Sequence, residues 1–91
     1  MKELEKEFTR KGFKFTQLDR TDKKAIYRQT DVETGILIGH EIFYIKISKE
    51  WEVAGNIIPE SEAYPGENQF GVTAWSVGRD IERATNKYTG L

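Results

Sequence analysis

The sequence lacks cysteine entirely and contains a single histidine and two prolines. The absence of cysteine excludes a disulfide framework, thiolate zinc sites and cysteine nucleophiles. Long hydrophobic runs are also missing, because Gly39, His40 and Lys46 interrupt the apolar clusters well before the ~20 residues that a membrane-spanning helix needs. The first seven residues contain no apolar segment of the kind found in signal peptides. We therefore expect a cytoplasmic protein that does not enter the membrane.

Motifs for catalysis, metal binding and phosphate binding are missing as well. A general base needs a partner within hydrogen-bond reach, and the neighbour of His40, Glu41, points to the opposite face of a strand. We interpret His40 as an ordinary histidine at a strand edge. The stretch from Gly35 to Gly39 is not followed by the Lys-Ser/Thr of a phosphate loop, and the glutamates near position 60 do not have the spacing of an EF-hand. We expect no enzymatic activity, no cofactor and no metal.

The length of 91 residues predicts one domain, spanning residues 1–91. Hydrophobic residues make up 37% of the chain, which is low for a globular protein, whereas aromatic residues make up 12%. Large rings bury much surface per residue and suit a thin core. A core of this size gives marginal stability, which favours a homodimer, formed for example by pairing of edge strands.

Hydrophobic periodicity predicts an α+β fold. Leu4 and Phe8, spaced i and i+4, predict a helix over residues 2–11 that ends at Gly12. Alternation predicts strands over 13–19, 24–31 and 36–48, with a hairpin loop at 31–35 and an irregularity at Gly39. Together the strands predict an antiparallel meander of three strands.

Two further segments complete this expectation. Residues 50–58 fit either a short fourth strand or a packed loop. A helix is predicted over 72–88, because apolar residues there follow a 3-4-3-4 spacing that forms one stripe; they are Ala74, Val77, Ile81, Ala84 and Tyr88. We expect a sheet of three to four strands with this helix packed on one face and the amino-terminal helix beside it.

Charge is divided unevenly along the chain. Residues 1–49 carry eleven Lys/Arg and eight Asp/Glu, whereas residues 50–69 carry five glutamates and no basic residue. Such an acidic segment with aromatic neighbours is suited to docking a basic partner protein. The candidate partner-binding residues are Trp51, Glu60, Glu62, Tyr64 and Glu67. The alternative interpretation is that the glutamates only solvate a loop whose aromatic residues pack in the core.

Basic residues offer a second candidate surface, for nucleic acid. They are Lys23, Lys24, Arg28, Arg79, Arg83 and Lys87. The last three would form a ridge on the carboxy-terminal helix, although cations near a helix carboxyl end also interact favourably with the helix dipole. The predicted order α-β-β-β-α is similar to that of double-stranded RNA-binding domains. That family has a basic cluster at the start of its final helix, where this chain has the uncharged stretch 70–75.

Four stretches of sequence resemble small uncharacterised accessory proteins encoded by bacteriophages and prophages. They are Ala25-Ile26-Tyr27, the strand His40–Ile47, the Tyr-Pro turn with its flanks from Glu62 to Gly71, and Ala74-Trp75. The resemblance covers residues 8–88. It implies a phage accessory protein in a bacterial cytoplasm and carries no catalytic residues. The function that we expect is non-enzymatic binding of a host or phage protein through the acidic 50–69 segment.

Overall fold

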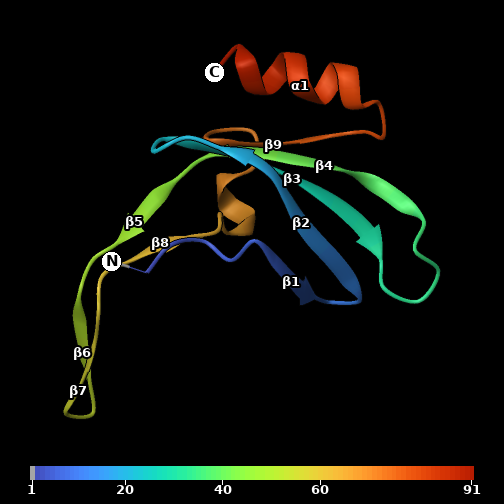
Figure 1. The fold of residues 1–91 in the computed structure, drawn as a ribbon. Helices are drawn as coiled ribbons and strands as arrows, with labels where there is room; N and C mark the ends of the chain where they lie inside the picture. Colours follow the sequence, from blue (N-terminus) through green and yellow to red (C-terminus); the bar gives the residue numbers. More distant parts are fainter. Residues whose placement is uncertain (1) are drawn as a thin grey trace.

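The fold is a five-stranded antiparallel sheet with one α-helix, described here for residues 2–91 of a computed structural model (Figure 1). The strand order in the sheet is β1-β2-β3-β4-β9. The bounds of these strands are Glu7–Arg10 for β1, Phe13–Arg20 for β2, Lys24–Asp31 for β3, Leu37–Tyr44 for β4 and Ala74–Val77 for β9. Helix α1 (Ile81–Thr89) lies across one face of the sheet. The predicted α+β class is confirmed, whereas the sheet has five strands instead of three or four.

The predicted meander is confirmed and extends to the amino-terminal side. Strands β1 to β4 pair in sequence order, each antiparallel to the next. Lys11 and Gly12 have φ values of 53° and 83°, as expected for the two central residues of a tight hairpin turn between β1 and β2. The register of β4 shifts between Leu37 and Gly39, where a Cβ on Gly39 would lie 2.8 Å from the carbonyl oxygen of Val77. The irregularity predicted at Gly39 therefore also permits a close approach to β9.

The amino-terminal helix predicted over residues 2–11 is wrong. Residues 7–10 form β1, and Lys2 makes a parallel bridge to Ser61. Leu4 and Phe8 are four residues apart. This spacing places two side chains on the same face of a helix and also on the same face of a strand, so the two apolar residues alone cannot distinguish a helix from a strand. Gly12 belongs to a hairpin turn, and the predicted α-β-β-β-α order is lost with the helix.

The helix predicted over residues 72–88 begins nine residues later. Residues 74–77 form β9, which pairs with β4, and α1 starts at Ile81. The Asp80 carboxylate caps this start by accepting the backbone N–H groups of Glu82 (3.0 Å) and Arg83 (3.3 Å). The apolar stripe is thus divided between a strand and a helix, and its residues lie in two clusters: Ala74 in one, and Val77, Ala84 and Tyr88 in the other.

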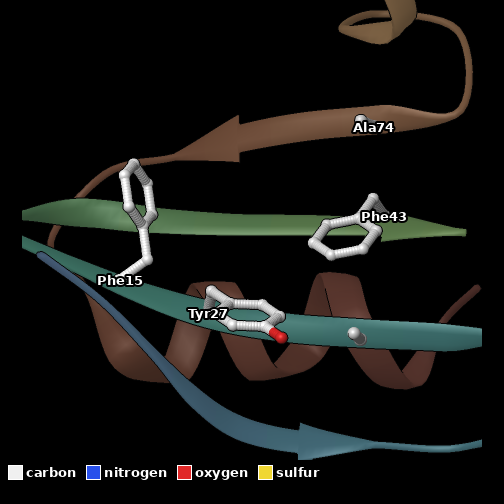
Figure 2. Packing of buried hydrophobic residues seen from close by; sticks show 5 residues of the cluster. Phe15, Tyr27, Phe43 and Ala74 are labelled. Atoms are coloured by element: carbon white, nitrogen blue, oxygen red, sulfur yellow. The ribbon is translucent and has the colours of Figure 1, made fainter. Parts of the chain in front are cut away.

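Aromatic rings fill the face of the sheet opposite α1. Phe15, Tyr27 and Phe43 come from β2, β3 and β4, and Figure 2 shows their side chains gathered on this face with Ala74 of β9. Tyr64 packs edge-on against Phe43 and Tyr27, with ring centroids 4.7 and 5.2 Å apart. Edge-to-face pairs of this kind add stability beyond the area that they bury. The chain around Tyr64 therefore forms a lid over the sheet.

A smaller apolar cluster joins α1 to the other face. Ile26 and Ile42 of the sheet contact Ala84 and Tyr88 of the helix. The ammonium group of Lys24 donates to the carbonyl oxygen of Tyr88 (2.8 Å), which satisfies a free carbonyl at the helix carboxyl end. Among residues 2–91, no helix combines the length and the apolar character needed to cross a bilayer.

Candidate binding surfaces

A two-stranded hairpin projects from the sheet on the side away from α1 (Figure 1). It consists of β6 (Trp51–Val53) and β7 (Asn56–Ile58), which pair only with each other, and we call residues 51–58 the arm. Ala54 and Gly55 form its turn with φ values of 49° and 83°. Residues 50–58 are therefore neither a fourth strand of the main sheet nor a packed loop.

The arm exposes an unusual amount of apolar surface. Its four large apolar side chains are between 40% and 65% exposed; they are Trp51, Val53, Ile57 and Ile58. Trp51 lies opposite Ile58 in the pairing, so these two side chains and Val53 share one face of the hairpin. Glu50, Glu52 and Glu60 are exposed beside them, and residues 50–60 contain no basic residue. Contiguous apolar surface rimmed by charge is typical of protein-interaction sites.

A short stem attaches the arm to the body. The stem consists of β5 (Lys46–Ser48) and β8 (Ser61–Ala63), and Lys2 runs beside β8 with its carbonyl oxygen 2.8 Å from the Glu62 backbone nitrogen. The guanidinium of Arg20 donates two hydrogen bonds to the Glu62 carboxylate, the Nη2 bond at 2.7 Å. The Leu4 N–H donates to the same carboxylate at 3.0 Å. This arrangement fixes the base of the arm to β2.

The electrostatic environment of the stem supports this anchoring. The hydrogen bond from Arg20 is the main cause that lowers the pKa of Glu62, and it raises the pKa of Arg20 in return. Glu62 is therefore a carboxylate at neutral pH. Because its side chain is only 8% exposed, its charge is directed to Arg20 and not to an external partner.

The five predicted partner-binding residues lie in four different settings. Trp51 and Glu60 are exposed on or beside the arm. Glu62 holds the stem, and Glu67 is exposed and pairs with Lys11 at 3.2 Å, away from the arm. Tyr64 lies in the aromatic cluster, where its hydroxyl donates to the buried Glu41 at 2.6 Å and burial raises its pKa far above the ordinary value for tyrosine. The structure thus brings only Trp51 and Glu60 together on a free surface.

The sequence interpretation missed Val53, Ile57 and Ile58 as surface residues. The signal was present in Trp-Glu-Val-Ala-Gly-Asn-Ile-Ile, where a two-residue turn separates two short apolar segments. The same segment also fits a core strand, since β-branched and aromatic residues are common in both settings. Only the tertiary structure shows that this hairpin does not pair with the main sheet.

A groove on the opposite side of the molecule carries basic charge. It encloses about 330 Å³ between β9 and α1 and is lined by Trp75, Ser76, Val77, Gly78, Arg83 and Lys87. We call it the basic groove. The ammonium group of Lys87 lies 4.3 Å from the centre of the Trp75 ring, so the cation covers one wall of the groove. Arg83 and Lys87, spaced i and i+4, line the same side of the helix.

The remaining basic candidates do not line this groove. The Lys24 ammonium group donates hydrogen bonds to the carbonyl oxygens of Tyr88 and Leu91 at the carboxyl end of α1. Arg79 precedes the helix, whereas Lys23 lies in the turn that leads into β3. Arg28 is exposed on β3, opposite His40 of β4. The predicted ridge is therefore reduced to Arg83 and Lys87.

His40 lies in the sheet interior and not at a strand edge. It is 1% exposed on β4, between β3 and β9, and its Nδ1 donates to the Gly78 carbonyl oxygen at 2.9 Å. Glu41 points to the other face, as predicted, where it accepts from Tyr64. Among residues 2–91, no cluster of three or more His, Asp and Glu side chains is arranged to hold a metal ion.

Comparison of the chain with protein-family models, with curated proteins and with solved structures finds no match. The surfaces described above are thus the basis for a functional proposal.

Proposed function

We propose that this protein is a non-enzymatic binding module whose arm docks onto a basic, apolar-lined surface of another protein. The observation that carries the proposal is the exposure of Trp51, Val53, Ile57 and Ile58 on a hairpin that pairs with no other strand in the described chain. A two-stranded hairpin alone is marginally stable in water. A partner that covers it would remove apolar surface from water and stabilise the hairpin at the same time.

The charge on the arm defines the chemistry of the partner. Glu50, Glu52 and Glu60 are exposed in the same segment, with Glu52 opposite Ile57 on the other face of the hairpin, and residues 50–60 contain no basic residue. Complementary charge steers encounter and disfavours acidic competitors, while the apolar face supplies most of the affinity. The expected partner therefore presents Lys and Arg around an apolar depression.

The position of the arm relative to the body of the protein is preorganised for binding. The Arg20–Glu62 pair and the hydrogen bond from Leu4 fix the stem, so the arm does not have to be positioned during binding. Trp51 serves as the anchor in this proposal, because tryptophan is enriched among residues that dominate binding energy. The resemblance to phage accessory proteins supports a host or phage protein as the partner and a bacterial cytoplasm as the compartment.

Affinity capture from bacterial lysate tests the proposal, with proteins identified by mass spectrometry. The wild-type protein is compared with the variant Trp51→Ala/Ile58→Ser and with Glu50→Lys/Glu52→Lys. Both variants should lose a captured basic protein, because the first removes the anchor and the second reverses the charge. Both should unfold in urea like the wild type, since all four positions are exposed.

The matched control is Asp22→Lys/Glu33→Lys, which makes the same change of net charge at exposed positions outside the arm. It should retain the captured protein. Equal capture by the wild type and by both arm variants would refute the proposal. Loss in the control together with the charge-reversed variant would show that only net charge matters.

A further inference from the structure

The basic groove has the chemistry that the arm requires of its partner. Trp75 and Val77 supply apolar surface, and Arg83 and Lys87 supply positive charge along one wall. The arm presents apolar side chains with Glu52, is flanked by Glu50 and Glu60, and contains no cation. The two surfaces of the same chain are therefore complementary in both polarity and charge.

The groove also has a strand edge that is open at Ser76, although the carbonyl oxygen of Ala74 on the same edge already accepts from the Gly71 N–H at 2.7 Å. Tyr44 N–H donates to the Thr73 carbonyl oxygen at 2.9 Å, which marks a hydrogen-bonded pair between β4 and β9. Such pairs alternate with non-bonded pairs in an antiparallel ladder, so Ser76, which lies opposite Glu41, directs its backbone N–H and C=O away from β4. Since β9 is the last strand of the sheet, these groups face outward beside the groove. An incoming strand would find both backbone and side-chain partners here.

The arm cannot fill the groove of its own chain. Figure 1 shows the arm projecting from the side of the sheet opposite α1, and the molecule is 45 Å long in its largest dimension. The stem is fixed to β2 by Arg20 and Glu62, which keeps the arm on its own side. Any contact between the arm and the basic groove must therefore join two molecules.

We propose that the arm of one copy docks in the basic groove of a second copy, with β6 or β7 beside the free edge of β9. In this contact Trp51 and Ile58, which share one face of the hairpin, lie against Trp75 and Val77. Glu50 and Glu52 alternate with Trp51 onto the other face, so their charges act on Arg83 and Lys87 at longer range and not through direct ion pairs. Two copies that exchange arms about a two-fold axis use both surfaces of both molecules, which gives a closed dimer. The inference rests on the proposed function, because it takes the arm as a docking element and assigns its partner as this same chain.

Sedimentation velocity across a concentration series tests the contact. The wild type should convert from monomer to dimer with rising concentration, and added salt should weaken the dimer because charged groups contribute to it. Trp51→Ala should weaken the association by about 30-fold, as expected for an interface anchor. A wild type that stays monomeric at every concentration overturns the inference. Open chains larger than a dimer support the same contact without the two-fold closure.

Charge reversal on each side provides a sharper test. Glu50→Lys/Glu52→Lys and Arg83→Glu/Lys87→Glu should each be monomeric, because each places like charges across the contact. An equimolar mixture of the two should associate again, since the basic arm of one variant then meets the acidic groove of the other. Adding Trp51→Ala to both variants changes no charge and should abolish this recovery. Recovery that survives Trp51→Ala reflects unspecific attraction and overturns the inference.

The failure of this inference can be distinguished from failure of the proposed function. If the protein stays monomeric while the arm variants still lose a partner from lysate, the arm binds another protein and the groove has a different occupant. Single-stranded DNA is the probe for that case, because Trp75 with two cations is suited to stacking and phosphate contact. The result to look for is salt-sensitive binding of a DNA oligonucleotide by the monomeric protein, which disappears with Arg83→Glu/Lys87→Glu. This result would show that the basic groove binds nucleic acid and not a second copy of the chain.

Discussion

The hydrogen bond between Tyr64 and Glu41 gives the clearest single test of the core. The Tyr64 hydroxyl donates to Glu41 Oε1 at 2.6 Å, whereas the second donor to this carboxylate, the Ser76 hydroxyl, lies at 3.4 Å. The variant Tyr64→Phe keeps the ring and its edge-on contacts and removes only the strong donor. The carboxylate is then left under-satisfied beneath the aromatic cluster.

The magnitude follows from the kind of bond that is lost. A hydrogen bond to a charged group contributes roughly 1.5–3 kcal/mol, so Tyr64→Phe should lower the free energy of unfolding by about 2 kcal/mol. For a domain of this size, that corresponds to a fall in melting temperature of roughly 8–16 °C. Urea denaturation followed by tryptophan fluorescence measures the first quantity, and calorimetry the second.

The matched control is Tyr44→Phe, which removes the same hydroxyl from a side chain that is 40% exposed. It should change the free energy of unfolding by less than about 0.5 kcal/mol. A double-mutant cycle with Glu41→Gln should show coupling of more than about 1 kcal/mol between positions 41 and 64. If Tyr64→Phe proves as mild as Tyr44→Phe, the hydroxyl does not satisfy Glu41 and the reasoning fails.

Three further predictions follow from the stem, the sheet and the turn of the arm. Arg20 lowers the pKa of Glu62 in the folded state. The wild type should therefore exceed Glu62→Gln in free energy of unfolding by the full amount above about pH 5, near the unfolded pKa of glutamate, and this difference should shrink as the pH falls through the folded pKa. Urea titrations of both proteins across acid pH check this, and a pH-independent difference would contradict it. Gly39→Ala should destabilise by about 1–3 kcal/mol, because its Cβ would lie 2.8 Å from the Val77 carbonyl oxygen; a melting temperature equal to that of the wild type would contradict the close approach of β4 and β9. Gly55→Val should disorder the arm turn, where φ is 83°, and weaken arm-dependent binding without changing global unfolding. Hydrogen exchange of the arm amides, compared with those of β3, measures this, and unchanged protection of the arm would count against it.

The strands of the meander were predictable because their pattern has one interpretation. In β2 the rings of Phe13 and Phe15 alternate with polar residues before the register shifts between Gln17 and Asp19, and the glycine in the loop after β3 has a positive φ of 75°. The error at the carboxy-terminal end arose because a 3-4 apolar spacing persists across Gly78. Asp80 carried the correct signal, since it is an N-cap residue placed directly before Ile81. The capping residue locates the start of a helix more sharply than the stripe does.

The exposure of the arm could not be predicted from the sequence, and the reason is physical. A segment such as Trp-Glu-Val has the same local preferences inside a sheet and outside it, and only competition for the sheet edge decides between them. Here β9 occupies the edge beside β4, so the segment between β4 and β9 turns back on itself as β6 and β7. Acidic residues could be assigned to this segment from the sequence, but the exposure of its apolar face depends on which strand takes the edge.

The distribution of apolar side chains connects the stability of this chain with its proposed role. Hydrophobic residues make up 37% of the sequence, and the main core relies on the rings of Phe8, Phe15, Tyr27, Phe43 and Tyr64. Burying a large apolar side chain stabilises a protein by about 1.5–3 kcal/mol, yet four such side chains stay exposed on the arm. A small core that forgoes this stabilisation can recover it when a second surface covers the arm. The arm gathers four of the exposed large apolar side chains on one hairpin, and the stem anchored by Glu62 holds them where a second surface can cover them together.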